Sequence, residues 1–74
     1  MSLEQECIAV LAKEVGPAAK PFLTRQCRTH LKKEPSNLQK NDLEELANWC
    51  FIGLKQSLGM QVAENVKKGL LDLK

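Results

Sequence analysis

Apolar side chains recur every three or four residues along the chain and do not alternate with polar ones, which is the period of a helix buried along one side. Short stretches rich in Gly, Pro, Ser and Asn interrupt this pattern at 16–17, at 34–37 and at 59. The pattern therefore predicts an all-α fold, a compact bundle of four short helices at about 3–15, 17–33, 42–58 and 61–73. The β-branched side chains are few and scattered, so we expect no strand.

Local signals predict the ends of the first two helices. Ser2 followed three residues later by Gln5 fits a capping box, which opens a helix. Gly16 stands where a residue in the left-handed conformation would close that helix. Pro17 suits the first position of the next helix, but Pro21 cannot donate a hydrogen bond to the carbonyl of Pro17. We therefore expect an irregular first turn or a kink in the second helix.

The second half of the chain carries similar signals. Asn41 as N-cap and Glu44 three residues later form a second capping signature for the third helix. In the loop before it, Leu38 is expected to plug onto the core. Gly69 lies inside the fourth helix and permits a close helix crossing, although it lowers helix stability by about 0.5–1 kcal/mol relative to Ala.

The buried face is clearest for the third helix, where apolar residues follow one another in helical register. These residues are Leu43, Leu46, Ala47, Cys50, Leu54 and Leu58.

Length limits the functions open to the chain. Folding of a chain of 74 residues hides only about 60% of its extended surface, so apolar burial and the entropy of ordering nearly balance. We expect one helical domain over 1–74. It has no room for a cleft between two domains or for a nucleotide-binding βαβ half, which argues against an enzyme.

The three cysteines indicate a reducing environment. Cys7, Cys27 and Cys50 are an odd number, widely spaced and without a C-x-x-C pair. The first apolar run is six residues long and follows Glu4 and Glu6, so we expect no signal peptide and no membrane span. We therefore expect a cytoplasmic protein that contacts no membrane, with its thiols buried as small hydrophobic groups.

Candidate catalytic and metal-binding residues are sparse. His30 has no serine or carboxylate partner at helical spacing on its own face. Cys27 and His30 could both touch one metal ion, but a structural zinc needs four ligands and only Cys7 and Cys50 remain to complete the set. Base rates of burial favour a histidine at the edge of the core beside a buried thiol. We expect no catalytic residue, no metal and no cofactor.

Charge is unevenly distributed although the net charge is only +2. Residues 16–40 hold six basic side chains and one acidic one. Arg25, Arg28 and Lys32, which we call the basic ridge, are spaced to line one face of the second helix. Three interpretations remain open: a solvated face that pairs with Glu side chains, a surface for an acidic protein, or a surface for phosphates.

Trp49 and Ile52 lie outside the buried stripe of the third helix. With Leu43 at zero and the stripe centred near 20°, Ile52 falls at about 180° and Trp49 at about 240°. One interpretation is that a second neighbouring helix covers them. The other is that they form an exposed apolar anchor for a partner, as aromatic side chains do at interface hot spots.

The stretch from Gly16 to Leu23 reads G-P-A-A-K-P-F-L. It resembles a G-P-x-A-x-x-[FL]-[LIV] signature of a small all-helical module in bacterial signalling proteins, commonly found near a kinase, cyclase or receiver domain. Gly16, Pro17, Ala19 and Leu23 match the signature, and the later helices fit the remainder of the module. The resemblance implies an accessory interaction or regulatory role, with no catalytic residues to carry over.

These observations favour a non-catalytic helical protein-interaction or regulatory module that binds a protein partner or itself. Its candidate partner-binding residues are Arg25, Arg28, Lys32, Trp49 and Ile52. The alternative is a small nucleic-acid-binding domain that lays the basic face of the second helix on phosphates. The eight-residue loop at 34–41 is longer than the turn of a helix-turn-helix, but the short turn at 16–17 leaves the first two helices open as such a pair.

Overall fold

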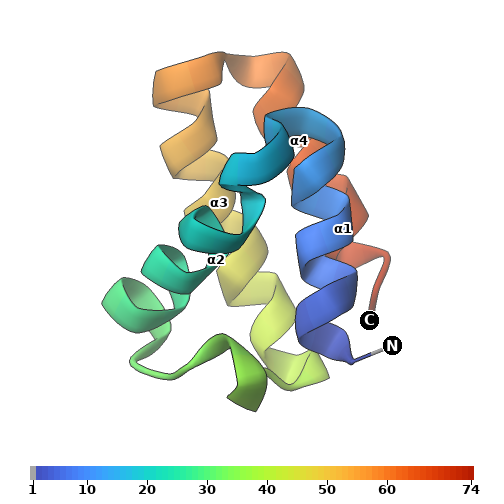
Figure 1. Cartoon of the computed structure of the whole chain (residues 1–74). Coiled ribbons are helices and arrows are strands. Elements are labelled where there is room, and N and C mark those ends of the chain that lie inside the picture. Colours follow the sequence, from blue (N-terminus) through green and yellow to red (C-terminus); the bar gives the residue numbers. More distant parts are fainter. Residues whose placement is uncertain (1) are drawn as a thin grey trace.

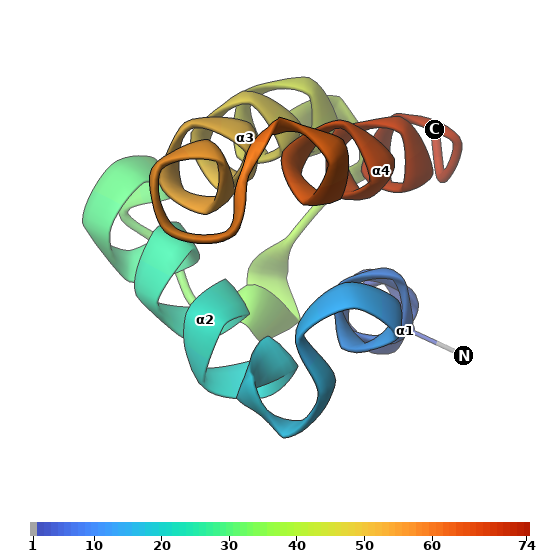
Figure 2. The same cartoon turned by 90° about the horizontal axis from the view of Figure 1, so that it is seen from above.

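The computed structural model describes residues 2–74 and contains, within them, four α-helices and no strand. The helices are α1 (Leu3–Val15), α2 (Ala19–Gln26), α3 (Leu43–Leu58) and α4 (Met60–Leu71). α3 and α4 form an antiparallel pair (Figure 1). Figure 2 shows α1 and α2 on one side of that pair, with α1 facing α4. The predicted all-α bundle is confirmed.

α1 begins and ends at the predicted residues. The Gln5 N–H donates to Ser2 Oγ and the Ser2 N–H donates to Gln5 Oε1, both at 3.2 Å, so the capping box is confirmed. Gly16 follows the last turn with a φ of +62°, a conformation that a side chain disfavours, and its N–H donates to the Ala12 carbonyl.

The segment predicted as a helix over 17–33 with an irregular start is helical as far as Leu31, but it combines three kinds of helical turn. It opens with a 3₁₀ turn, Gly16–Ala18, continues as α2, and ends in a π-turn, Cys27–Leu31. The irregular first turn is confirmed, since Pro21 lacks the N–H that would continue an α-helix back to Pro17.

The π-turn ends the segment two residues earlier than predicted. The Lys32 N–H donates to the Cys27 carbonyl, five residues back, and Lys32 itself has a left-handed φ of 58°. A left-handed residue at this place closes a helix and redirects the chain.

The loop before α3 corrects another prediction. Leu38 is buried as expected, with 8% of its surface exposed. Asn41 is not the N-cap, because a 3₁₀ turn, Lys40–Asp42, leads into α3 and the capping box lies one turn earlier. There the Gln39 N–H donates to Asp42 Oδ2 at 2.9 Å. Lys33 Nζ also lies 2.8 Å from Asp42 Oδ2, which ties the end of the π-turn to the start of α3.

α3 ends at Gly59, whose φ is +98°, and α4 begins at the next residue. α4 starts one residue before and ends two residues before its predicted bounds. The close crossing expected at Gly69 is confirmed: a Cβ built there would stand 2.7 Å from Val10 Cγ1 of α1.

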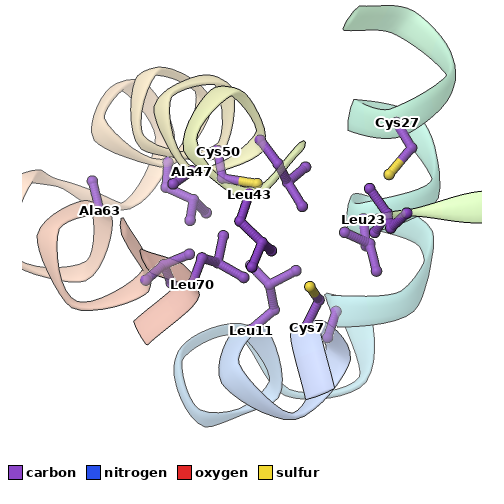
Figure 3. Close-up of a cluster of buried hydrophobic side chains, with 14 residues drawn as sticks. Cys7, Leu11, Leu23, Cys27, Leu43, Ala47, Cys50, Ala63 and Leu70 are labelled. Atoms are coloured by element: carbon purple, nitrogen blue, oxygen red, sulfur yellow. The ribbon is translucent and has the colours of Figure 1, made fainter. Parts of the chain in front are cut away.

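The core lies where all four helices meet, and Figure 3 shows its side chains. The prediction that Leu58 belongs to this core is wrong. Leu58 is 51% exposed, because it is the last residue of α3 and lines an open hollow of about 410 Å³ between that end of α3 and the turn that joins α1 to α2. No helix within residues 2–74 is both long enough and apolar enough to cross a membrane. The side chains with no exposed surface include Cys7, Leu11, Leu23, Cys27, Leu43, Leu46, Ala47, Cys50, Ala63, Val66 and Leu70.

Candidate interaction surface

The basic ridge is exposed but is not built on one regular helix. Arg25 lies in α2 and Arg28 lies in the π-turn. Lys32 is the left-handed residue that follows this turn. The spacing of three and four residues aligns side chains only on a continuous α-helix. Here the π-turn and the left-handed residue interrupt the α-helix, and the ridge consists of two overlapping pairs: Arg25 and Arg28 line one hollow, and Arg28 and Lys32 line another.

Arg28, at the centre of the ridge, is paired within the molecule. Its Nε and Nη2 donate to the two carboxylate oxygens of Glu34 at 2.9 and 2.8 Å, a bidentate arrangement. The hydrogen bonds from Arg28 lower the pKa of Glu34, and the same contact raises the pKa of Arg28. Glu34 therefore offsets the positive charge at the middle of the ridge. Within residues 2–74, Arg25 and Lys32 form no ion pair.

Trp49 and Ile52 have different surroundings. The Trp49 indole stacks on the His30 imidazole of the π-turn, with ring centroids 3.8 Å apart and ring planes 5° from parallel. His30 and Trp49 are both half-buried. Ile52, three residues further along α3, is 47% exposed. A neighbouring element thus covers part of Trp49, as one interpretation expected, whereas Ile52 faces outward, as the other did.

The thiols expected in the core are there. Cys7, Cys27 and Cys50 are free and fully buried. Burial, followed by the electrostatic influence of neighbouring groups, raises the pKa of Cys27 to about 11 and the pKa values of Cys7 and Cys50 to about 12. Since the thiolate is the nucleophile and the metal ligand, these groups are suited to packing. Among residues 2–74, no group of three His, Cys, Asp or Glu side chains is placed to hold a metal ion.

A groove of about 420 Å³ runs between α2 with its π-turn and α3. Arg25, Thr29 and His30 line it from one side, Gly53 and Ser57 of α3 line it from the other, and Phe22 and Gln26 complete it. Gly53 has no side chain to fill the space, and a Cβ built there would stand 3.7 Å from Gln26 Nε2. The groove therefore joins one cation of the basic ridge to the histidine that stacks on Trp49.

Gln26 is the functional candidate that sequence reasoning missed. It is the one buried polar residue among those described, 9% exposed, and its Oε1 has no hydrogen-bond partner. A buried acceptor without a partner costs about 1–3 kcal/mol. The available signal was a polar residue between Leu23 and Cys27, on the face of the second helix predicted to be buried.

The structure does not gather the five predicted site residues in one place, although Arg25 and Arg28 line the same hollow beside α2. Arg25 lines the groove, and Trp49 adjoins it through His30. Arg28 and Lys32 line a separate hollow together with Glu34, and Ile52 lies on the outward side of α3. Comparisons of the chain with protein-family models, with curated proteins and with solved structures found no match.

Proposed function

We propose that the chain is a non-catalytic protein-interaction module that recognises a protein partner with the surface around Ile52, Trp49 and Arg25. The observation that carries this proposal is Ile52: a large apolar side chain, half exposed, on the same side of α3 as a partly covered indole. In a small domain apolar burial barely exceeds the entropy of ordering. An isoleucine exposed beside such an indole offers a partner an apolar anchor of the kind found at interface hot spots.

The charge distribution supports a protein partner over a nucleic acid. A phosphate backbone is bound by several unpaired cations acting together. Here Glu34 holds Arg28, and Lys33 is paired with Asp42, so the positive field of the second segment is interrupted. The remaining free cation beside the groove, Arg25, is suited to a single carboxylate of a protein.

A reducing compartment such as the cytoplasm is part of the proposal. Three free cysteines meet in one core, and the fold uses them as small apolar side chains. A regulatory role is also part of the proposal, since an accessory module acts by occupying a surface of another protein.

The proposal is tested by capture of partners from a cytosolic extract, with Ile52→Ser compared with Leu58→Ser. Leu58 is the matched control because it is equally exposed, at 51%, at the far end of α3. We expect Ile52→Ser to lose at least nine tenths of the captured protein and Leu58→Ser to retain it. Sedimentation of the purified chain at micromolar concentrations separates a second copy from a foreign partner.

Two results would contradict the proposal. One is equal capture by the wild-type chain and Ile52→Ser. The other is tight binding of duplex DNA that weakens steeply with salt and is lost in Arg25→Glu, which would favour the nucleic-acid alternative.

A further inference from the structure

The groove between α2 and α3 combines a free cation with an unsatisfied buried acceptor. Arg25 lines the groove without an ion pair among residues 2–74, and Gln26 Oε1 beneath it has no donor. A ligand that satisfies both must bring a negative group and a hydrogen-bond donor close together. Aspartate and glutamate residues in a polypeptide carry this combination, because each has a carboxylate beside its own backbone N–H.

A second hollow extends the site across α2. This hollow has a volume of about 600 Å³. It is lined by Lys20, Pro21 and Thr24 together with Arg25, Arg28 and Thr29. Arg25 and Thr29 line both this hollow and the groove. No acidic residue lines either one among the residues described. An extended chain passing over Arg25 and Thr29 would thus meet positive charge on both sides of α2.

From this the geometry points to an acidic, extended peptide segment of a partner protein as the ligand of the α2–α3 groove. One carboxylate pairs with the Arg25 guanidinium, and a backbone N–H of the same segment donates to Gln26 Oε1. This inference rests on the proposed interaction function and names the chemistry of the partner.

The donor requirement separates a peptide from a phosphate. A phosphodiester offers only acceptors at its backbone, so it can engage Arg25 but leaves Gln26 Oε1 without a partner. In the unbound fold Oε1 is buried and Nε2 is the carboxamide atom nearest the space over Gly53, so the carboxamide must turn about its last torsion, which is soft, to present Oε1 to the groove. The absence of a side chain at Gly53 leaves space for a peptide backbone to approach.

The groove volume sets the scale of the contact. At about 420 Å³ it lies at the lower end of the range for small-ligand sites, about 300–1,000 Å³. It therefore receives one or two residues, and the rest of the affinity comes from the surface around Ile52. Binding of the isolated fragment is accordingly expected in the millimolar range.

The test is a titration of the ¹⁵N-labelled chain with N-acetyl-glutamate N-methylamide, followed by NMR. Matched probes are N-acetyl-glutamine N-methylamide, which lacks the charge, and dimethyl phosphate, a phosphodiester that carries the charge but lacks the donor. We expect the glutamate probe alone to shift both the Gln26 side-chain amide and the backbone amides of Arg25 and Gly53. Arg25→Gln should weaken binding at least tenfold, and Lys55→Gln, which changes an exposed cation of α3 that lines neither hollow, should leave it unchanged within twofold.

Gln26→Leu provides a second readout that does not depend on how much the contact between Arg25 and the carboxylate contributes to binding. It should weaken the glutamate probe at least threefold while raising the unfolding midpoint, since it removes the unsatisfied acceptor from the fold. The inference is overturned if the glutamine probe or dimethyl phosphate shifts the same amides to the same extent, or if no probe shifts them. If capture of a partner still depends on Ile52 in that case, the proposed function stands and only the groove is wrong.

Discussion

The Trp49 indole and the His30 imidazole lie face to face, 3.8 Å between centroids and 5° from parallel, although 19 positions separate them in the sequence. The contact joins the π-turn to the middle of α3. His30 of this pair also lines the groove between α2 and α3, together with Gln26 and Arg25.

Removal of the imidazole should expose the indole. We expect His30→Ala to shift the fluorescence of Trp49, the single tryptophan, to longer wavelength and to lower the free energy of unfolding by about 0.5–1.5 kcal/mol. Thr29→Ala is the matched control, because Thr29 is exposed on the same turn. An unchanged emission maximum in His30→Ala would mean that the ring does not cover the indole in solution.

Two glycines should respond to alanine with opposite signs. At Gly69 the new Cβ would stand 2.7 Å from Val10 Cγ1, so we expect Gly69→Ala to destabilise the fold by about 1–3 kcal/mol despite the better helix propensity of alanine. At Gly53 the nearest atoms are 3.7 Å away, so Gly53→Ala should stabilise it by about 0.5–1 kcal/mol.

Urea unfolding of the two variants measures both changes. A repeat of Gly69→Ala in a Val10→Ala background, where the clashing methyl groups are gone, should recover most of the loss through coupling of the two sites. Equal effects of alanine at Gly53 and Gly69 would contradict the close crossing of α1 and α4.

Asp42 should make the stability of the fold depend on pH. The hydrogen bond from Lys33, then the one from the Gln39 N–H, lowers the pKa of Asp42 below its usual value. A carboxyl group with a lowered pKa in the folded state contributes stability above its unfolded pKa, and this contribution is lost as pH falls through the folded pKa. We therefore expect Asp42→Asn to cost on the order of 1 kcal/mol at pH 7 and little at pH 2.

Thermal unfolding between pH 2 and pH 7 measures this difference. Glu64→Gln is the control, because Glu64 is exposed and forms no ion pair among the residues described. A loss in Asp42→Asn that stays constant over the whole range would exclude the carboxylate as its cause.

The thiols should react only when the chain unfolds. Cys7, Cys27 and Cys50 have no exposed surface, and their raised pKa values leave almost no thiolate at neutral pH. We expect a disulfide reagent such as dithionitrobenzoate to modify all three together, at a rate that rises with urea in step with unfolding. Rapid modification of a single thiol in the absence of urea would show a local opening.

Signals contained within one turn of chain were sufficient to predict much of the fold. Ser2 and Gln5 cap α1 as expected, and Gly69 marks the helix crossing. The prediction of Asn41 as the N-cap was wrong, because a capping signature does not reveal that Lys33 of the preceding segment pairs with Asp42 and that a 3₁₀ turn precedes α3. The prediction that Leu58 is buried was wrong, because helical register predicts on which side of a helix a residue lies, but not how far the neighbouring helices extend.

The candidate site was less accessible to sequence reasoning. The positions of Arg25 and Ile52 on exposed faces follow from periodicity. The pairing of Arg28 with Glu34 and the stacking of His30 on Trp49 depend on a left-handed turn and a π-turn that periodicity alone does not predict. Gln26 stands out in the sequence as a polar residue on a face predicted to be buried, but its unsatisfied oxygen is revealed only by the structure.

The π-turn has a consequence for how this surface tolerates insertion and deletion. A π-turn holds one residue more than the α-helical turn it replaces. Deletion of one residue within Cys27–Leu31 would let α2 continue as a regular helix, and the remaining residues of the turn would change their orientation around its axis. Trp49 would then meet a different side chain while the core at Leu23 stayed in place. A change of length by one residue would therefore alter the binding face while leaving the helices beneath it intact.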